Sequence, residues 1–278
     1  MGPEDHVGML LGQHTPVVDR YAPELLFPIP RQDNRRRLGL SSGPLPFRGY
    51  DLWRAYEVSW LNSLGKPVVM LAEFMVPVHS PCMIESKSFK LYLNSFNQAR
   101  FDSAESVRQR MLRDLSAVAG AEVLVQLSSL DNLDGFGPSL PEGESLDGLD
   151  IGIEEYQPNP ALLTADPDSE VEQVLYSDLF KSNCPVTGQP DWGTVVLRYQ
   201  GPEIDREGLL RYLISYREHE GFHEDCAEQI FRDLMARCTP SSLSITLHFL
   251  RRGGLEIVPV RSTEPSRLDF PAARLIRQ

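Results

Sequence analysis

The alternation of apolar and polar residues predicts strands most clearly near the end of the chain. Between residues 243 and 249 every second residue is apolar. A period of two predicts a strand with one buried face. Gly253 and Gly254 then separate this strand from a second apolar run at residues 255–260. A Gly-Gly pair between two apolar runs is typical of a hairpin turn, so we predict two antiparallel strands here.

Two helices are predicted before this hairpin. Apolar residues recur every four positions from Phe222 to Cys238 and form one wide apolar stripe. A shorter helix is predicted over residues 206–216, and residues 192–200 and 171–176 before it are predicted as strands. The order in this half is therefore strand, strand, helix, helix, strand, strand.

The first half of the chain shows a similar order. Alternation over residues 56–60 and an apolar run over 68–76 predict two strands. Apolar spacing predicts a helix over residues 89–96 and then a second helix, which begins at a capping box formed by Asp102 and Glu105.

Residues 123–127 alternate again, and residues 151–156 are the candidate closing strand of this first half. Two similar halves indicate either an old duplication or simply two α+β domains. The segment between them is rich in Gly, Pro, Asp and Glu, as long surface connections are. We predict an N-terminal extension (1–45), a first module (46–130), an acidic connection (131–170) and a second module (171–278).

The charge of the 278-residue chain is unevenly distributed. The chain has 27 basic and 39 acidic residues, a net charge of −12. Eleven of the acidic residues, and no Lys or Arg, lie in residues 131–170, so the rest of the chain sums to −1. The two modules can therefore accept a phosphate-bearing cofactor. We expect no direct contact with nucleic acid, because no stripe of basic residues is visible.

Neither membrane insertion nor a structural metal site is indicated. The longest apolar stretch, residues 67–78, is interrupted by Glu73 and falls short of the ~20 residues that span a bilayer. No secretory signal is visible, so we expect a soluble cytoplasmic protein. The four cysteines are spaced 102, 42 and 12 residues apart, with no CxxC pair, and we predict free thiols and no structural zinc.

A first chemical candidate is Cys184, which lies in a turn-rich segment, residues 181–192, just before a predicted strand. Loops on a rigid scaffold often hold reactive groups, and a thiol is a strong nucleophile even when only a small fraction is ionised. Asp191, seven residues later, can act as a general acid or base if partly buried. The alternative is an inert buried cysteine and a turn-forming aspartate. Cys226 and Cys238 lie on the apolar stripe and are predicted to be core residues.

Two further segments could hold a phosphate. Glu85 and Ser86 begin a helix, where free backbone N–H groups favour anions, and Lys87 adds a positive charge. The turn at residues 251–254 offers two guanidinium groups. The alternatives are an ordinary helix cap with solvated lysines and a solvated hairpin tip.

A third segment, residues 219–224, could recognise a base. His223 and Glu224 are predicted to point away from the apolar stripe, and a carboxylate can accept two parallel hydrogen bonds from a guanine-like edge. His219 and His223 are four residues apart, but Gly221 interrupts the helix between them. We therefore do not expect a metal site.

Together, these segments resemble one family closely. Residues 85–97, 182–193 and 219–226 are similar to the long, two-module form of the QueF family, the NADPH-dependent 7-cyano-7-deazaguanine (nitrile) reductases of queuosine biosynthesis. The resemblance covers about residues 50–260. It implies an α+β fold of two tandem tunnelling-fold modules, each an antiparallel sheet with two helices (ββααββ), which agrees with the order predicted above. No GxGxxG segment is present, so a Rossmann site for the nicotinamide is not expected.

The resemblance also implies a reaction. Cys184 would attack the nitrile carbon and form a covalent thioimide, NADPH would deliver a hydride to it, and Asp191 would deliver a proton. The bound imine would then accept a second hydride, so two NADPH would convert the nitrile to the aminomethyl group of the product.

The same resemblance implies the binding residues and the assembly. The substrate would be held by Glu85, Glu224, His223 and the backbone around Ile84 and Ser86, and the NADPH phosphates by Ser86, Lys87, Arg252 and Gly253. A homodimer is expected, because paired tunnelling-fold sheets leave no exposed strand edge. Two alternatives stay open: a pterin- or GTP-cyclohydrolase relative with a zinc site, and a purine-binding module without catalysis.

Overall fold

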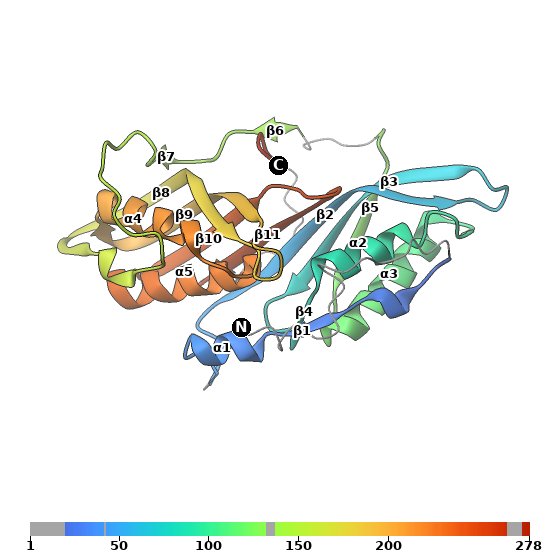
Figure 1. The fold of residues 1–278 in the computed structure, drawn as a ribbon, viewed down its shortest axis with the longest axis horizontal. Helices are drawn as coiled ribbons and strands as arrows, with labels where there is room; N and C mark the ends of the chain where they lie inside the picture. Colours follow the sequence, from blue (N-terminus) through green and yellow to red (C-terminus); the bar gives the residue numbers. More distant parts are fainter. Residues whose placement is uncertain (1–19, 42, 132–136, 266–273) are drawn as a thin grey trace.

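A computed structural model describes residues 20–41, 43–131, 137–265 and 274–278. Residues 1–19 of the predicted N-terminal extension lie outside these described residues. One long sheet crosses the molecule (Figure 1), with helices on one face and the connecting segment that carries β6 (Pro138–Ser139) along the other. The short strand β7 (Glu144–Ser145) of this segment pairs at one edge of the sheet. The predicted α+β class is therefore confirmed. In the part of the chain described, no helix is long and apolar enough to span a membrane.

The first half contributes three strands of the main sheet, two longer helices and a small separate sheet. The small sheet pairs β1 with β4, antiparallel, and brings the N-terminal extension against the first half. These elements are β1 (Pro28–Pro30), α1 (Gln32–Arg37), β2 (Arg48–Leu61), β3 (Pro67–Pro77), β4 (Cys82–Ile84), α2 (Ser86–Asn94), α3 (Ala104–Ala119) and β5 (Leu124–Ser128), with the 3-10 helix η2 (Pro23–Leu25) before them.

The second half has the predicted order of two strands, two helices and two strands. Its elements are β8 (Ala165–Asn183), β9 (Pro190–Ile204), α4 (Arg206–Ile214), α5 (His223–Cys238), β10 (Ser242–Phe249) and β11 (Leu255–Ser262). Shorter elements are β6 (Pro138–Ser139), β7 (Glu144–Ser145), η3 (Pro160–Leu162), η4 (Ser215–Glu218) and β12 (Arg274–Leu275).

The two halves share a single sheet. Its strand order is β5-β3-β2-β11-β10-β9-β8-β7, and the halves meet where β2 pairs antiparallel with β11. This pairing runs from Arg48 opposite Ser262 to Ala55 opposite Leu255. Because backbone hydrogen bonds continue across the joint, the loops at this end of both halves are held in a fixed relation to each other.

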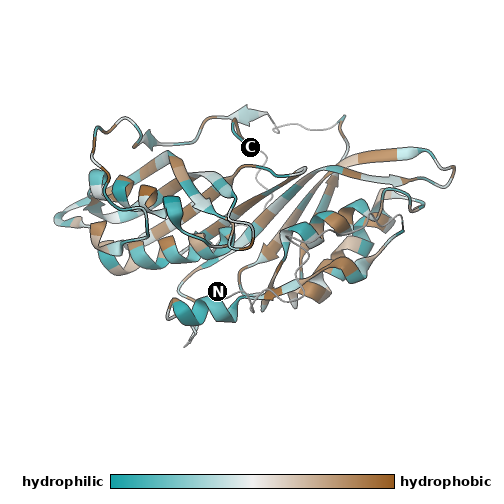
Figure 2. Ribbon diagram, viewed as in Figure 1, coloured by the Kyte–Doolittle hydropathy of each residue, from teal (hydrophilic) through white to brown (hydrophobic). Residues whose placement is uncertain are grey.

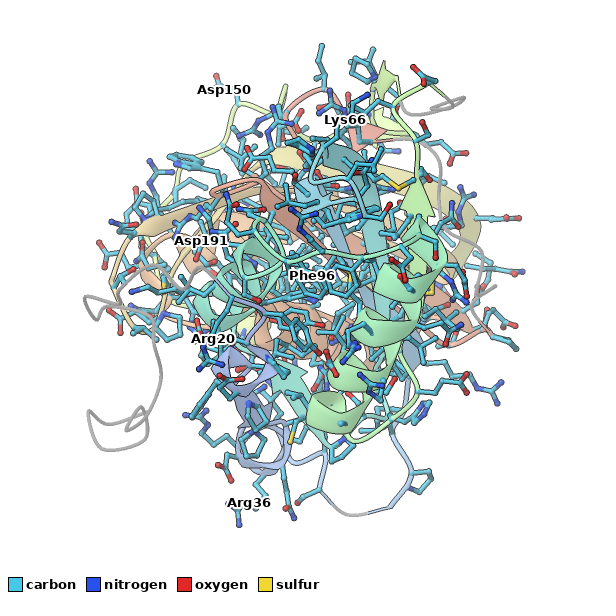
Figure 3. All side chains as sticks on the ribbon, turned by 90° about the vertical axis from the view of Figure 1, so that its right-hand side faces the viewer. Arg20, Arg36, Lys66, Phe96, Asp150 and Asp191 are labelled. Atoms are coloured by element: carbon cyan, nitrogen blue, oxygen red, sulfur yellow. The ribbon has the colours of Figure 1, made fainter. Side chains whose placement is uncertain are left out.

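One apolar core lies between the sheet and its helices. Phe89 of α2 is fully buried and meets Trp53 and Phe74 edge to face, with ring centroids 5.3 and 5.0 Å apart. Burying each such side chain contributes roughly 1.5–3 kcal/mol. Figure 2 shows apolar residues along the central strands and on α2 and α3, whereas α1 is polar throughout. Figure 3 shows Phe96 in the interior and Arg36 at the periphery.

Two sequence predictions are wrong. No strand forms at residues 151–156. The carbonyl of Gly152 accepts from the Arg211 side chain and that of Tyr156 from the Glu218 N–H, so this backbone bonds to the second half instead of a ladder. The predicted capping box of Asp102 and Glu105 also does not form, and the cap lies one residue later. Ser103 caps α3 by accepting from the Ser106 N–H, while the Glu105 carboxylate bonds forward to side chains of its own helix.

The joint between β2 and β11 needs a glycine at residue 49. Gly49 has a φ of +134°, and a Cβ there would lie 2.1 Å from the carbonyl oxygen of Val260. We expect Gly49→Ala to destabilise the protein by roughly 3 kcal/mol, because it adds both backbone strain and a clash with main-chain atoms. Urea unfolding measures this cost.

Gly39 provides the matched control. Its φ is +71°, but a Cβ there would meet nothing within 4 Å. Gly39→Ala should therefore lose only about 1 kcal/mol, the cost of the left-handed backbone alone. Equal losses in the two variants would contradict the assignment of a tight joint at Gly49.

Candidate active site

A cavity of about 270 Å³ opens where the two halves meet. Its walls come from β2 and the start of α2 in the first half, and from the β8–β9 loop, the start of α5 and the β10–β11 hairpin in the second. All ten residues that the sequence selected lie on its walls: Ile84, Glu85, Ser86, Lys87, Cys184, Asp191, His223, Glu224, Arg252 and Gly253.

Cys184 is held in the tight loop between β8 and β9. Its N–H donates to the Gln189 carbonyl at 2.8 Å, and its own carbonyl accepts from the Gly188 N–H at 2.9 Å. The preceding residue, Asn183, is bonded through its backbone to the segment before α5. Cys184 is 7% exposed and lines the cavity, so its thiol is held in place at the wall.

Asp191 begins the next strand and contacts two donors. Its Oδ1 lies 2.7 Å from Nη2 of Arg252 and 3.4 Å from Nε2 of His223. The His223 ring stacks on Phe249, with centroids 3.8 Å apart and planes 15° apart. Arg252 also donates to the Pro190 carbonyl, which ties the hairpin to the start of β9. A carboxyl held at the wall of the cavity that Cys184 also lines is able to transfer a proton.

Glu85 is the cap of α2 as well as a wall of the cavity. Its carboxylate accepts from the N–H groups of Lys87 and Ser88, at 2.8 and 2.7 Å. These helix N–H groups are therefore not free for a phosphate, which corrects the expectation from the sequence. Burial raises the pKa of Glu85 although both hydrogen bonds oppose the shift. An anion near this end of α2 must rely on the lysine side chains more than on the helix backbone.

Glu224 is the other buried carboxyl of the cavity. It is the second residue of α5 and is 5% exposed. Burial and, next, the negative charge of Asp51 raise its pKa to about 7, against the opposing charge of Arg31. Its ionisation at neutral pH is therefore finely balanced.

Several wall residues escaped the sequence reasoning. Lys90 lies on α2, three residues after Lys87, and this spacing could have revealed it. Its ammonium lies against the hairpin, since a Cβ on Gly253 would be 2.0 Å from Nζ. Trp53 and Ile29 gave no such signal, because Trp53 reads as a core residue and Ile29 comes from the N-terminal extension.

The remaining cysteines and histidines of the described residues do not line this cavity. Cys226 and Cys238 are buried in the core, as predicted, and Cys82 is half-buried on β4. Burial lowers the pKa of His219, which lines a separate, smaller cavity beside Asp225. Among the described residues, no group of three or more His, Cys, Asp or Glu side chains could hold a metal ion.

Comparison with known proteins gives consistent matches. The family model for the N-terminal part of nitrile reductase, 7-cyano-7-deazaguanine reductase, matches residues 17–127, and a model named QueF-like protein matches residues 190–267. An NADPH-dependent 7-cyano-7-deazaguanine reductase of Dechloromonas aromatica is 56% identical over 91% of this chain and 89% of its own length. This chain belongs to that reductase family.

Other members of the reductase family match at similar levels. The enzyme of the same name from Chromohalobacter salexigens is 52% identical over 96% of both chains. Among solved structures, an archaeosine synthase QueF-Like in the apo form matches 35% of this chain and 97% of its own, at 24% identity and a TM-score of 0.31.

The four thiols should differ in reactivity. We expect iodoacetamide at pH 8 to label Cys184 and Cys82 in the native protein and to leave Cys226 and Cys238 unmodified. Burial raises the pKa of the Cys226 thiol, and it raises that of Cys238 to about 11, so both remain protonated. Peptide mapping by mass spectrometry measures the sites, with urea-unfolded protein as the control in which all four react. Labelling of Cys226 as fast as that of Cys184 would contradict the assigned positions.

Proposed function

We propose that this protein reduces the nitrile of 7-cyano-7-deazaguanine to the aminomethyl group of 7-aminomethyl-7-deazaguanine with two NADPH, in queuosine biosynthesis. One observation carries the proposal: a cysteine, a carboxylic acid and two buried carboxylates from both halves converge on one cavity. The family membership of the chain gives the reaction class, and its relatives are named for this NADPH-dependent reduction.

The two buried carboxylates suit the substrate base. A deazaguanine presents a ring N–H and an amino group on one edge, and a carboxylate can accept from both in parallel. We assign this edge to Glu224, with His223 beside it, and further base contacts to Glu85 and the backbone of Ile84 and Ser86. Because unpaired buried donors cost free energy, such a site discriminates against bases that lack these groups.

Cys184 supplies covalent catalysis in this scheme. Its sulfur bonds to the nitrile carbon, one π bond of the nitrile breaks, and the nitrogen takes up a proton, which gives a thioimide. Asp191 is the proton donor, and its contacts with Arg252 and His223 hold the carboxyl at the cavity wall. The adduct is a better hydride acceptor than the nitrile. NADPH, when bound, would supply the hydride for each of the two reductions, and the nitrogen takes up one proton in each. Between the two reductions the C–S bond breaks, which gives the bound imine and the free thiol of Cys184.

The rim of the cavity has the donor set that NADPH phosphates require. Lys87 and Lys90 project from α2 in the first half, and Arg252 and Gly253 face them from the hairpin in the second. Ser86 adds a hydroxyl at the start of α2. Ammonium and guanidinium groups bind phosphate without a Rossmann glycine loop, in agreement with the sequence, which has none.

We further propose two tandem tunnelling-fold modules, residues 46–130 and 171–278, in a homodimer. The element order of the second half and the antiparallel pairing that continues from β5 to β8 support the modules. The strand β5 lies at one end of the sheet and pairs only with β3 within the described part of the chain. Such an edge is usually covered, and a second copy of this chain is the partner we propose.

Replacing the nucleophile tests the reaction. We expect Cys184→Ala to lower the nitrile-dependent oxidation of NADPH by at least about a thousandfold, because covalent activation is lost. Wild type mixed with the nitrile alone should gain the mass of one substrate, and the variant should gain none. Cys82→Ala is the control, since Cys82 does not line the cavity, and it should retain both properties. NADPH oxidation by Cys184→Ala at the wild-type rate would overturn the scheme.

Replacing Lys90 tests the cofactor site. We expect Lys90→Met to raise KM for NADPH by about tenfold, because one charge-assisted contact to phosphate is lost. The adduct with the nitrile should form as in wild type, since this step needs no cofactor. Lys66→Met, at the exposed turn between β2 and β3, is the matched control and should leave KM unchanged. An unchanged KM for NADPH in Lys90→Met would remove Lys90 from the cofactor site.

A further inference from the structure

The N-terminal extension reaches the cavity at β1, through the side chain of Ile29. This residue is the middle one of the strand, is 7% exposed and lines the cavity. It lies opposite Met83 in the small sheet formed by β1 and β4. Val186 of the β8–β9 loop and Phe222, the residue before α5, pack against these two side chains. This small apolar cluster therefore joins the extension to two segments of the second half.

Val186 belongs to the same short loop as the proposed nucleophile. Cys184 lies two residues before it, and the backbone N–H and carbonyl of Cys184 bond to Gln189 and Gly188. The loop is therefore closed on itself and can move only as a unit. Residues 187–190 are exposed, whereas Val186 is half-buried in the apolar cluster. Support of Val186 by the cluster is consequently support of Cys184.

The sequence of β1 makes this support stiff. Pro28 and Pro30 flank Ile29, and a proline ring fixes φ at roughly −65°. Phe27 and Ile29 each precede a proline, which confines them to extended conformations. Residues 27–30 therefore keep one extended backbone, and the direction of the Ile29 side chain is set by it.

Hydrogen bonds at the start of α2 hold the N-terminal end of β1. The carbonyl of Phe27 accepts from the Glu85 N–H at 2.9 Å, and the N–H of Phe27 donates to the Ser88 hydroxyl at 3.0 Å. Glu85 itself lines the cavity. This end of the strand is thus attached to the first half of the site.

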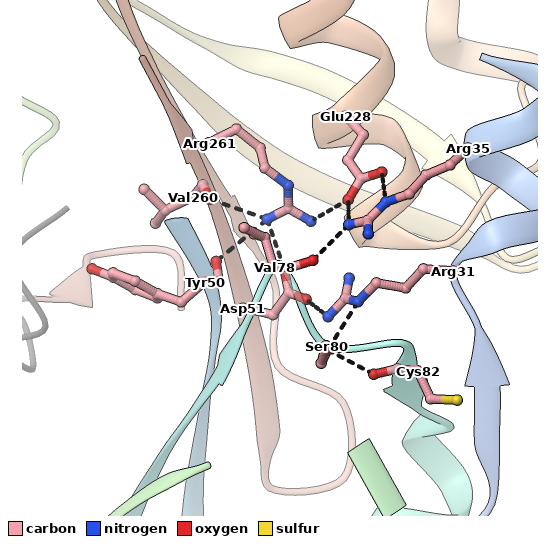
Figure 4. A network of polar contacts seen from close by, with 10 residues as sticks. All are labelled: Arg31, Arg35, Tyr50, Asp51, Val78, Ser80, Cys82, Glu228, Val260 and Arg261. Atoms are coloured by element: carbon pink, nitrogen blue, oxygen red, sulfur yellow. Dashed lines mark hydrogen bonds and ion pairs between the residues drawn. The ribbon is translucent and has the colours of Figure 1, made fainter. Parts of the chain in front are cut away.

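A buried ion cluster of five residues holds the extension directly after β1 (Figure 4). Arg31 donates to Asp51 of β2 at 2.5 Å, and Arg35 forms two hydrogen bonds to the Glu228 carboxylate of α5, at 3.0 and 2.7 Å. Arg261 of β11 bridges Asp51 and Glu228 at 2.8 and 3.2 Å. The cluster connects the extension with both halves of the sheet, so β1 is anchored at each end.

We propose that Ile29 is a positioning residue, which supports the Cys184 loop through Val186 and so sets the place of the thiol for attack on the nitrile. The N-terminal extension is then part of the active site. A misplacement of about 1 Å between reacting atoms lowers a rate by roughly a hundredfold, so a small shift of the loop matters. This inference rests on the proposed function, because it assigns the nucleophile to Cys184.

The rate of adduct formation with 7-cyano-7-deazaguanine, in the absence of NADPH, tests the proposal. Rapid quenching followed by mass spectrometry measures this rate at saturating nitrile. We expect Ile29→Ala to lower it by at least about tenfold, because the loop loses its support. Ile29→Val removes one methyl group and should lower it by only about threefold. The Kd of NADPH, measured by calorimetry, should stay within about twofold, since Ile29 is not part of the basic rim. A tenfold rise of this Kd would contradict a role confined to the loop.

A double-mutant cycle shows whether Ile29 acts through Val186. Val186→Ala should lower the rate of adduct formation by about the same factor as Ile29→Ala. The variant with both changes should be little slower than either one, because the second truncation removes a support that is already lost. Losses that multiply would show two independent contributions and would overturn the proposal. If Ile29→Ala does not fold, Ile29→Val replaces it in the cycle, and it should slow the Val186→Ala protein no further.

Ile245→Ala is the control for a general loss of stability. Ile245 on β10 is fully buried in the main core and does not line the cavity. Its truncation should lower the free energy of unfolding at least as much as Ile29→Ala does, and it should leave the rate of adduct formation within about twofold. If Ile245→Ala slows adduct formation as much as Ile29→Ala, the effect is not one of positioning and the proposal fails.

The wild-type protein distinguishes this inference from the proposed function. If wild type forms no adduct with the nitrile, the proposed function fails. If wild type forms the adduct and Ile29→Ala forms it at the same rate, only the role of Ile29 fails.

Discussion

The antiparallel pairing of β2 with β11 is the constraint on which the rest of the structure depends. It turns two halves into one sheet, and it brings the start of α2 opposite the β10–β11 hairpin. Neither half alone surrounds the cavity, because the thiol and acid come from the second half and Glu85 and the lysines from the first. Backbone hydrogen bonds across the joint hold these groups in register more rigidly than side-chain contacts between separate domains would.

The buried ion cluster reinforces this joint at a cost. Five charges are withdrawn from water, and such a cluster is seldom more stable than well-packed apolar residues of the same volume. Asp51 pairs with two arginines, one from the extension and one from β11, so the cluster fixes these segments relative to β2. The same low dielectric that makes the charges costly lets them act on neighbouring groups such as Glu224.

The sequence predicted local patterns well and long-range pairing poorly. The alternation at residues 243–249 and the stripe from Phe222 to Cys238 correspond to β10 and α5, because one face of each is buried against the core. The sequence did not predict the full length of β8, because the first residues of this strand are mostly exposed and acidic and show no apolar alternation. Residues 151–156 resembled a strand, but their backbone finds its partners in the second half. No local signal encodes such partners.

The residues of the candidate site show the same difference between local patterns, which the sequence reveals, and long-range packing, which it does not. All ten selected residues line the cavity. The motifs that hold them were weak signals one by one, and it was their combined resemblance to one family that implied this set of residues. Ile29 was missed because it belongs to the extension, and its place on the cavity wall arises only from what packs around it.

The net charge of −12 is concentrated away from the cavity. None of the described residues of the acidic connection lines the cavity, and two of its glutamates, Glu142 and Glu144, pair with Arg198 and Arg206 of the second half. Exposed charges beyond roughly 8 Å are largely screened at physiological ionic strength. A phosphate at the cavity therefore responds mainly to the basic groups on the rim. The local arrangement of these charges therefore decides the affinity of an anion for the cavity. The net charge of the whole chain is a poor guide to this affinity.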